Sequence, residues 1–266
     1  MALVKEISKK EIPDLIKELS NDRRNLFFIN NLELYTLSKE IKVYKVDKAF
    51  VLNWMDESIL LFAPDSYDAK TMIEFLEKQK FNGINGAKEY LLPIADTLKN
   101  EFSIEYRQFM MIDKEKFIKP LTRDLRLREL FSPEDYEMLF DLYMRIPLFK
   151  DDFKTGDRSE WALEKAELEY PFAGVALSLD NKFVSGAYLG AATRKSAMVV
   201  GVGTDPEYEN KGFGTSVVSE LVDIALNENN IDYLGLWYSD EKAKHLYQKI
   251  GFTSIGEYAY FKRKHR

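Results

Sequence analysis

Residues 198–215 read MVVGVGTDPEYENKGFGT. The run Met198–Gly203 is short, apolar and rich in valine, which favours a buried strand. Pro206 ends this strand, because proline cannot donate to the ladder of a sheet. Apolar residues then recur at helical spacing over Phe213–Leu226, so the turn at Asn210–Thr215 lies between a strand and the first turn of a helix.

A turn in this place can hold phosphate groups. The first N–H groups of a helix lack partners within the helix and lie at the positive end of its dipole. Gly212 and Gly214 carry no Cβ, so phosphate oxygens can approach the backbone closely. Lys211 precedes its glycine, unlike the Walker order, and Val217 stands where a Rossmann turn has its third glycine. The segment therefore predicts a phosphate-binding turn that is neither a Walker loop nor a Rossmann turn.

The segment resembles the pyrophosphate loop of the GNAT acyltransferase superfamily, whose pattern is Arg/Gln-x-x-Gly-x-Gly/Ala between a strand and a long helix. The matching positions are Glu209, Gly212 and Gly214, with Glu209 standing where the family usually has Arg or Gln. The likeness is at the level of motifs over Ala197–Phe252, and in the order of elements it runs from Leu125 to the C-terminus.

A second segment, DEKAKHLYQKIGF at Asp240–Phe252, resembles the closing helix of the same family. That helix commonly reads Asn-x-x-Ala-x-x-x-Tyr-x-x-x-Gly-Phe. Ser239 or Asp240 takes the place of the Asn, and the positions in register are Ala243, Tyr247, Gly251 and Phe252. The strand expected at Ile231–Tyr238 separates the two motifs.

The resemblance implies acetyl-CoA or another acyl-CoA as cofactor and direct acyl transfer to an amine through a tetrahedral oxyanion. A backbone N–H near Val202 or Gly203 would stabilise the oxyanion, and the two glycines flanking Val202 fit a β-bulge there. Tyr247 would be the catalytic acid, because a tyrosine with a pKa of about 10 is protonated when a thiolate with a pKa of about 8.5 departs. A buried position on an apolar helix face is the other interpretation of Tyr247.

The strand would hydrogen-bond the pantetheine arm as an added strand does, and the turn would hold the pyrophosphate. The cofactor-binding residues that the resemblance implies are Val200, Gly201, Val202, Gly203, Thr204, Glu209, Asn210, Lys211, Gly212, Phe213, Gly214, Thr215, Ser239 and Lys242.

The acceptor side of the site is less defined. The amine must lose a proton, and four candidate bases stay open: Asp205, Glu207, Tyr238 and Asp240. We expect the acceptor, an amine of a small molecule, amino acid or peptide, to bind between the loop from Arg145 to Arg158, which includes the polar segment Phe149–Asp157, and the splayed strands. Asp151 and Asp152 in that loop would attract a cationic amine. His245 is expected to face solvent, and no metal-ligand spacing is present.

Composition bounds the class of protein. The chain has 266 residues, 45% of them hydrophobic, which is enough for a packed core. It has no cysteine, which excludes disulfides and a cysteine nucleophile and fits a reducing compartment. The net charge of −6 argues against nucleic-acid binding, and no apolar run reaches the length of a membrane span. We therefore expect a cytoplasmic protein that acts on neither nucleic acid nor membranes.

The expected fold is α/β (α+β), with a mixed, mostly antiparallel central sheet flanked by helices. Residues 1–120 predict a strand, two helices, strands, a helix, a strand or loop, a helix and a strand, and residues 121–266 repeat this order. We interpret this as two GNAT-like halves in tandem, of which only the second keeps the cofactor turn. The segment Gly83–Gly86 precedes a helix but lacks the long strand and the basic residue of a cofactor turn, so we interpret it as an ordinary loop. The linker between the halves is expected near Ile118–Thr122, where Pro120 breaks regular structure. Such a chain can be a monomer or a homodimer.

Two other functions stay open. One is a GNAT-fold protein that binds acyl-CoA without turnover, which Glu209 and the missing Asn favour. The other is an aminoacyl-tRNA-dependent transferase of tandem GNAT-like halves. The acidic net charge and the pair Gly212 and Gly214 speak against the latter.

Overall fold

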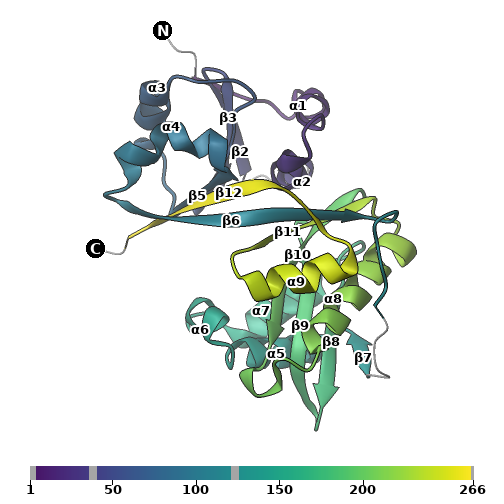
Figure 1. The fold of residues 1–266 in the computed structure, drawn as a ribbon. Helices are drawn as coiled ribbons and strands as arrows, with labels where there is room; N and C mark the ends of the chain where they lie inside the picture. The colour runs from purple at the N-terminus through teal and green to yellow at the C-terminus, as the bar shows by residue number, and fades with distance from the viewer. Residues whose placement is uncertain (1–3, 36–40, 121–125, 265–266) are drawn as a thin grey trace. The chain divides into compact units, whose positions relative to one another are not determined.

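The computed structural model describes residues 4–35, 41–120 and 126–264 (Figure 1). Leu3, Leu125 and residues 121–122 of the expected linker lie outside this range. The chain forms two compact units. The N-terminal unit takes in the chain up to Met110 together with Trp237–Ser239 and the residues from Ser254 on, and the C-terminal unit takes in Met111–Leu236 and Asp240–Thr253.

The N-terminal unit is a mostly antiparallel sheet flanked by helices. Its sheet has the order β1-β2-β3-β4-β5-β12-β6, in which β4 and β5 are a parallel pair and β12 (Thr253–Arg263) runs antiparallel to β5. Its other elements are β1 (Val4–Glu6), α1 (Ile12–Leu19), α2 (Leu26–Tyr35), β2 (Ile41–Val46), β3 (Ala49–Trp54), β4 (Ser58–Phe62), α3 (Ala69–Leu76), β5 (Gly83–Ala87), α4 (Lys88–Leu98) and β6 (Phe102–Asp113).

The C-terminal unit repeats this order of elements with one more short helix. Its sheet has the order β11-β10-β9-β8-β7, and here β10 and β11 are the parallel pair. Its elements are β7 (Leu127–Glu129), α5 (Pro133–Tyr143), α6 (Pro147–Phe153), α7 (Arg158–Ala166), β8 (Gly174–Leu179), β9 (Lys182–Gly190), β10 (Ser196–Thr204), α8 (Phe213–Asp223), β11 (Tyr233–Tyr238) and α9 (Glu241–Ile250). The expected fold class and the repeated order are confirmed.

Two segments expected as loops are regular structure. The segment 149–157 was expected as a polar loop, but α6 covers most of it, because Pro147 takes the first position of a new helix rather than ending the previous one. The segment Gly83–Gly86 is part of strand β5, which pairs with β4. Gly86 lets the strands approach, since a Cβ there would lie 2.6 Å from the Leu61 carbonyl oxygen.

Helix ends also differ from the pattern. Asp68 caps α3 by accepting from the Thr71 N–H at 2.8 Å. The helix after the glycine turn ends at Asp223, and a π-helical turn continues it to Glu228. The division at residue 120 stays a prediction. The compact units differ from it, because β12 pairs with β5 and is grouped with the N-terminal unit.

The start of α5 follows its sequence pattern. Ser132 caps the helix, Pro133 takes its first position, and Asp135 completes a capping box with Ser132. Asp135 also forms an ion pair with Arg128 of β7. These contacts fix the helix that carries Tyr143 and leads into Arg145.

A buried ion pair holds the end of β10. Arg145 Nε lies 2.7 Å from Asp205 Oδ2, and the Asp205 side chain is only 4% exposed. The same guanidinium donates to the Phe183 and Asp141 carbonyl oxygens. Burial by itself would raise the pKa of Asp205, but hydrogen bonds from Arg145 and the Glu207 N–H, with the charge of Arg145, hold it below its usual value.

We expect Asp205→Asn to lower the free energy of unfolding by about 2–3 kcal/mol, less than for a fully buried pair because Arg145 is partly exposed. The folded-state pKa is depressed. The contribution is therefore complete above the unfolded aspartate pKa of about 3.9 and is lost as pH falls through the folded value. Urea unfolding of the native chain and the variant between pH 7 and pH 3 measures both the lost free energy and its dependence on pH. Asp96→Asn, at a pair where Asp96 is 98% exposed, is the control and should change stability by less than about 0.5 kcal/mol. Equal effects of the two variants would contradict the account.

Candidate functional site

Strand β10 contains the β-bulge expected at its glycines. Val200 pairs with Tyr188 and Gly203 with Gly186, so two residues of β10 lie opposite one residue of β9. Gly201 has a φ of +63° inside this bulge. A Cβ there would also lie 2.4 Å from the Tyr143 hydroxyl oxygen, so both the backbone conformation and the available space require glycine.

The other edge of β10 is open beyond its first residues. In the described part of the chain, pairing with β11 runs only from Ser196 opposite Tyr233 to Met198 opposite Gly235. The strand continues to Thr204, and Val200, Gly201, Val202 and Thr204 are partly exposed. An extended ligand can therefore add to this edge through backbone hydrogen bonds.

The glycine turn presents an uncapped helix N-terminus. Gly212 is the N-cap of α8 with a φ of +83°, and no side chain caps the helix. A Cβ built at Gly212 would meet nothing within 4 Å, so there is open space beside this residue. The first N–H groups of α8 and the positive end of its dipole lie next to this space, an environment that suits an anionic phosphate.

The flanking residues add positive charge and an aromatic surface. Lys211 Nζ lies 4.6 Å from the centre of the Tyr208 ring and donates to the Glu207 carbonyl oxygen. Glu209, in the family's Arg/Gln position, is extended and exposed, and the neighbouring Asn210 is exposed with a φ of +60°. Phe213 and Thr215 of α8 are partly exposed, and the Phe213 ring stacks near that of Tyr208 at 6.4 Å. Glu209 therefore places a negative charge beside the proposed phosphate site.

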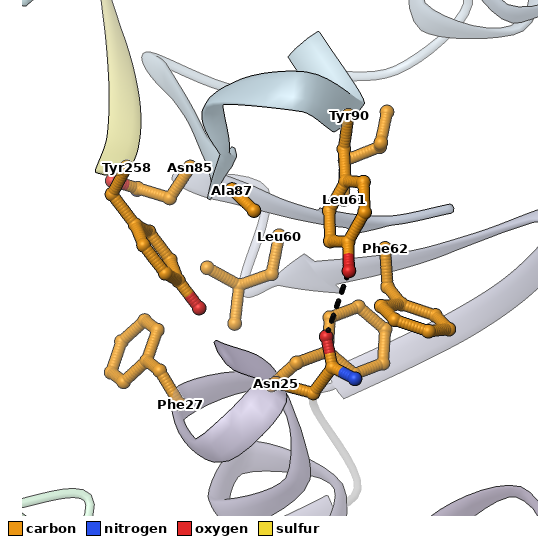
Figure 2. Close-up of a pocket in the computed structure, with 11 residues that line it drawn as sticks. Asn25, Phe27, Leu60, Leu61, Phe62, Asn85, Ala87, Tyr90 and Tyr258 are labelled. Atoms are coloured by element: carbon orange, nitrogen blue, oxygen red, sulfur yellow. Dashed lines mark hydrogen bonds between the residues drawn. The ribbon is translucent and has the colours of Figure 1, made fainter. Parts of the chain in front are cut away.

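The corresponding place in the N-terminal unit is closed. Helix α3 is capped by the Asp68 carboxylate, which accepts from the Thr71 N–H, so an anionic group already lies at this helix N-terminus. Beyond the paired part of β4 and β5 remains a cavity of about 10 Å³, the size of one water molecule. Figure 2 shows Phe62 and Tyr90 lining this cavity, with the Tyr90 hydroxyl 3.4 Å from Asn25 Oδ1. This cavity is too small for a pantetheine arm.

Tyr247 is largely buried. Its side chain is 5% exposed and packs edge-to-face on Phe252 at 5.7 Å. Burial raises the pKa of Tyr247 above its usual value, so its hydroxyl is protonated at neutral pH. Ser239 and Lys242 are exposed at the start of α9, and His245 is exposed as expected. The buried tyrosine can donate a proton but offers little surface to solvent.

Of the candidate bases, Asp205 is committed to Arg145, and Glu207 lies 3.9 Å from Lys182. Asp240 caps α9 by accepting from the Lys242 N–H, and Tyr238 is buried. In the acceptor segment, Asp151 pairs with Lys154 at 2.8 Å and is 83% exposed, while the side chain of Asp152 lies outside the described residues. Asp205 is thus a poor base, and Asp151 already has a cation.

A groove of about 280 Å³ lies beside this segment. Aromatic rings from three helices and three carboxylates line it: Phe140, Phe153, Trp161, Asp157, Glu160 and Glu164. Glu164 pairs with Lys165, whose ammonium also lies 5.8 Å from the Trp161 ring centre. An alkylammonium therefore already interacts with these groups. The sequence pattern did not indicate that aromatic residues of three helices share a groove.

Sequence reasoning also missed the groups that hold the bulge. The Tyr143 hydroxyl donates to the Gly201 carbonyl oxygen at 2.8 Å, and the Ser185 hydroxyl donates to the Gly203 carbonyl oxygen at 3.0 Å. These residues lie on α5 and β9, far from β10 along the chain. Neither belongs to a motif, and only the mutual approach of the strands and the helix brings them to the bulge.

These features together define a protein that can hold an anionic group at a helix N-terminus and an extended chain along a strand. Residues 126–252 match the acetyltransferase (GNAT) family. The chain thus carries a GNAT-family domain in its C-terminal half, and its N-terminal half is GNAT-like by fold. The fold of this family supports acyl transfer from acetyl-CoA in general.

Solved structures share the fold over nearly the whole chain. A GCN5-related N-acetyltransferase from Kribbella flavida matches with a TM-score of 0.66 at 14% identity, covering 90% of this chain and 96% of its own. A Drosophila protein matches with a TM-score of 0.72 at 12% identity, covering 99% of each chain. A tandem GNAT protein from the clavulanic acid biosynthesis pathway matches with a TM-score of 0.63 at 8% identity, covering 98% of each chain. No curated protein matches the sequence.

The described residues were also compared with the requirements of a membrane-spanning helix and of a metal site. None of the helices in the described ranges is long and apolar enough to cross a membrane. Over the same residues, no group of three or more histidine, aspartate or glutamate side chains is arranged to hold a metal ion.

Gly201 and Gly212 both have a positive φ, but a Cβ would clash with Tyr143 at Gly201 and would meet open space at Gly212. The variants Gly201→Ala and Gly212→Ala therefore separate the cost of this clash from the cost of the backbone conformation. We expect Gly201→Ala to cost about 2–4 kcal/mol, because backbone strain and the contact with Tyr143 add. Gly212→Ala meets only the strain and should cost about 1 kcal/mol. Chemical unfolding of both variants measures the difference, and equal costs would show that the bulge is not confined by Tyr143.

Proposed function

We propose that this protein is an acyl-CoA-dependent N-acyltransferase that transfers an acetyl group from acetyl-CoA to an amine. The observation that carries the proposal is the uncapped N-terminus of α8 at Gly212, at the end of a strand whose edge is open. Acetyl-CoA would supply an activated acyl thioester. The residues present fit its pyrophosphate, because the space at Gly212 is free and no side chain caps the N-terminus of α8.

Each part of the site has a role in this proposal. The N–H groups of Gly212–Thr215 and the ammonium of Lys211 hold the pyrophosphate. The backbone of β10 from Val200 to Thr204 binds the pantetheine arm along the open edge, while Ser239 and Lys242 contact the cofactor from the start of α9. An N–H of the bulge, at Val202 or Gly203, stabilises the negative charge that develops on the acyl oxygen.

Tyr247 is the general acid in this proposal. Its hydroxyl is protonated at neutral pH, as a proton donor to a departing thiolate must be, while burial, which raises its pKa, makes it a weaker acid than an exposed tyrosine. The base stays unassigned among Glu207, Tyr238 and Asp240, and a chain of water molecules can serve instead. Asp205 is left out, because its carboxylate is held by Arg145.

The acceptor in this proposal is an amine of a small molecule, amino acid or peptide. Its support is the groove between α5, α6 and α7, whose rings and carboxylates suit a cationic amine. This groove takes the role that the sequence gave to Asp151 and Asp152. The proposal includes no nucleic-acid or membrane partner and a monomeric or homodimeric protein in the cytoplasm.

A second candidate function is a GNAT-fold protein that binds acyl-CoA without turnover. Two observations favour it: the carboxylate of Glu209 beside the phosphate turn, and the burial of the Tyr247 side chain. Release of free CoA in the presence of an amine separates the two functions, since only the enzyme produces it.

The cofactor is tested by thermal unfolding with and without acetyl-CoA. A ligand at one hundred times its dissociation constant stabilises the folded state by about 2.7 kcal/mol, which raises the Tm by about 5 °C. We expect this shift for the native chain and its loss in Gly212→Glu, whose carboxylate repels phosphate at the helix N-terminus. Gly212→Ala is the control and should keep most of the shift. No shift at millimolar acetyl-CoA in the native chain would contradict the proposal.

Tyr247→Phe tests the acid. The phenyl ring keeps the packing on Phe252 but has no proton to donate, so we expect CoA release to fall by about 10²–10⁴-fold with unchanged acetyl-CoA binding. Pre-steady-state CoA release and calorimetric binding measure the two quantities. Tyr136→Phe, which alters a buried tyrosine of α5 with no role in the proposed reaction, is the comparison. A Tyr247→Phe variant with native activity would remove Tyr247 from the mechanism.

A further inference from the structure

The bulge of β10 is held at two successive points by side-chain hydroxyls. The Tyr143 hydroxyl of α5 donates to the Gly201 carbonyl oxygen at 2.8 Å. The Ser185 hydroxyl of β9 donates to the Gly203 carbonyl oxygen at 3.0 Å and also lies 2.9 Å from Thr204 Oγ1. Gly201 and Val202 have no partner in the register with β9, whereas Gly203 lies opposite Gly186. The Tyr143 hydroxyl therefore binds a carbonyl of the bulge itself, and the Ser185 hydroxyl binds a carbonyl at its end.

Fixing a carbonyl group fixes the N–H group of the next residue. The Gly201 carbonyl and the Val202 N–H belong to one planar trans peptide unit, in which they point in opposite directions. Tyr143 approaches that carbonyl from α5. The Val202 N–H therefore points away from Tyr143. A rotation of this peptide unit would break the Tyr143 hydrogen bond, so the hydrogen bond opposes such a rotation.

Tyr143 is itself rigidly placed. Its ring packs edge-to-face on Phe149 at 5.0 Å and on Trp161 at 6.2 Å, and its side chain is completely buried. Burial raises the pKa of Tyr143 well above its usual value, so the hydroxyl stays a donor throughout the neutral range. The carbonyl oxygen of Gly201 is thus held by a neutral donor that has little freedom to move.

We propose that Tyr143 is a positioning residue that aims the Val202 N–H at the acyl oxygen of the bound acyl-CoA. It acts through the Gly201 peptide and does not touch the reacting atoms. This inference rests on the proposed function and adds to it the residue that orients the oxyanion donor. A donor already in place before reaction needs no reorganisation, which is why such donors are effective.

The test uses acetyl-CoA labelled with ¹³C at the acyl carbonyl and follows its NMR signal when bound. A hydrogen bond from Val202 polarises the carbonyl and displaces its resonance from the free position. We expect this displacement with the native chain and its loss in Tyr143→Phe, which removes one oxygen atom and keeps the ring. Affinity for CoA, which has no acyl group, should stay unchanged in the variant.

Tyr136→Phe is the matched control. Tyr136 belongs to the same buried cluster, and its hydroxyl also donates to a backbone carbonyl, that of Leu130 at 3.3 Å. Its removal should leave the carbonyl displacement at the native value. A merely structural role of Tyr143 would make the two variants behave alike.

Three outcomes are informative. Loss of the displacement in Tyr143→Phe alone supports the inference. A native displacement in Tyr143→Phe, or an equal loss in Tyr136→Phe, overturns the inference and leaves the proposed function standing. Failure of the native chain to bind acetyl-CoA at all overturns the proposed function and this inference with it.

Discussion

The site depends on one constraint: strand β10 cannot keep regular pairing on both of its edges. On one edge the bulge at Gly201 shifts the register with β9, and on the other the parallel pairing with β11 stops at Met198. Unpaired backbone groups are costly unless they find partners. Hydroxyls of Tyr143 and Ser185 satisfy two carbonyls at the bulge, and the open edge is left for an extended ligand.

The same topology occurs twice in the chain with opposite results. In the C-terminal unit the helix after the parallel pair begins at a glycine with free space in front of it. In the N-terminal unit the N-cap of the corresponding helix is Asp68, whose carboxylate accepts from the Thr71 N–H. Phe62 and Tyr90 line the small cavity beyond β4 and β5. Two sequence differences, Gly against Asp at the cap and large rings beside the strands, thus distinguish the proposed cofactor site from the corresponding place in the N-terminal unit.

Much of the fold could be predicted because its signals are local. The valine run, the glycine turn and the capping box at Ser132 each specify an element through residues close in sequence. Elements that depend on distant partners were misjudged. Strand β5 is glycine-rich and looks like a loop until β4 pairs with it, and Pro147 reads equally as the end of one helix or the start of another.

The candidate site divides in the same way. The phosphate turn and the bulge glycines follow from backbone requirements that a sequence expresses directly, namely positive φ and the absence of a Cβ. Tyr143, Ser185 and Arg145 could not be found, because a hydroxyl or guanidinium that binds a distant backbone carbonyl leaves no periodic pattern. The groove residues of α5, α6 and α7 were missed for the same reason.

The central claim is that only one of the two GNAT-like halves holds acyl-CoA. Isothermal titration of the native chain with acetyl-CoA measures this directly, because it gives the number of sites per chain as well as the affinity. The account predicts one site per chain, since the N-terminal cavity of about 10 Å³ has room for a single water molecule. Two sites per chain, or none, would contradict it.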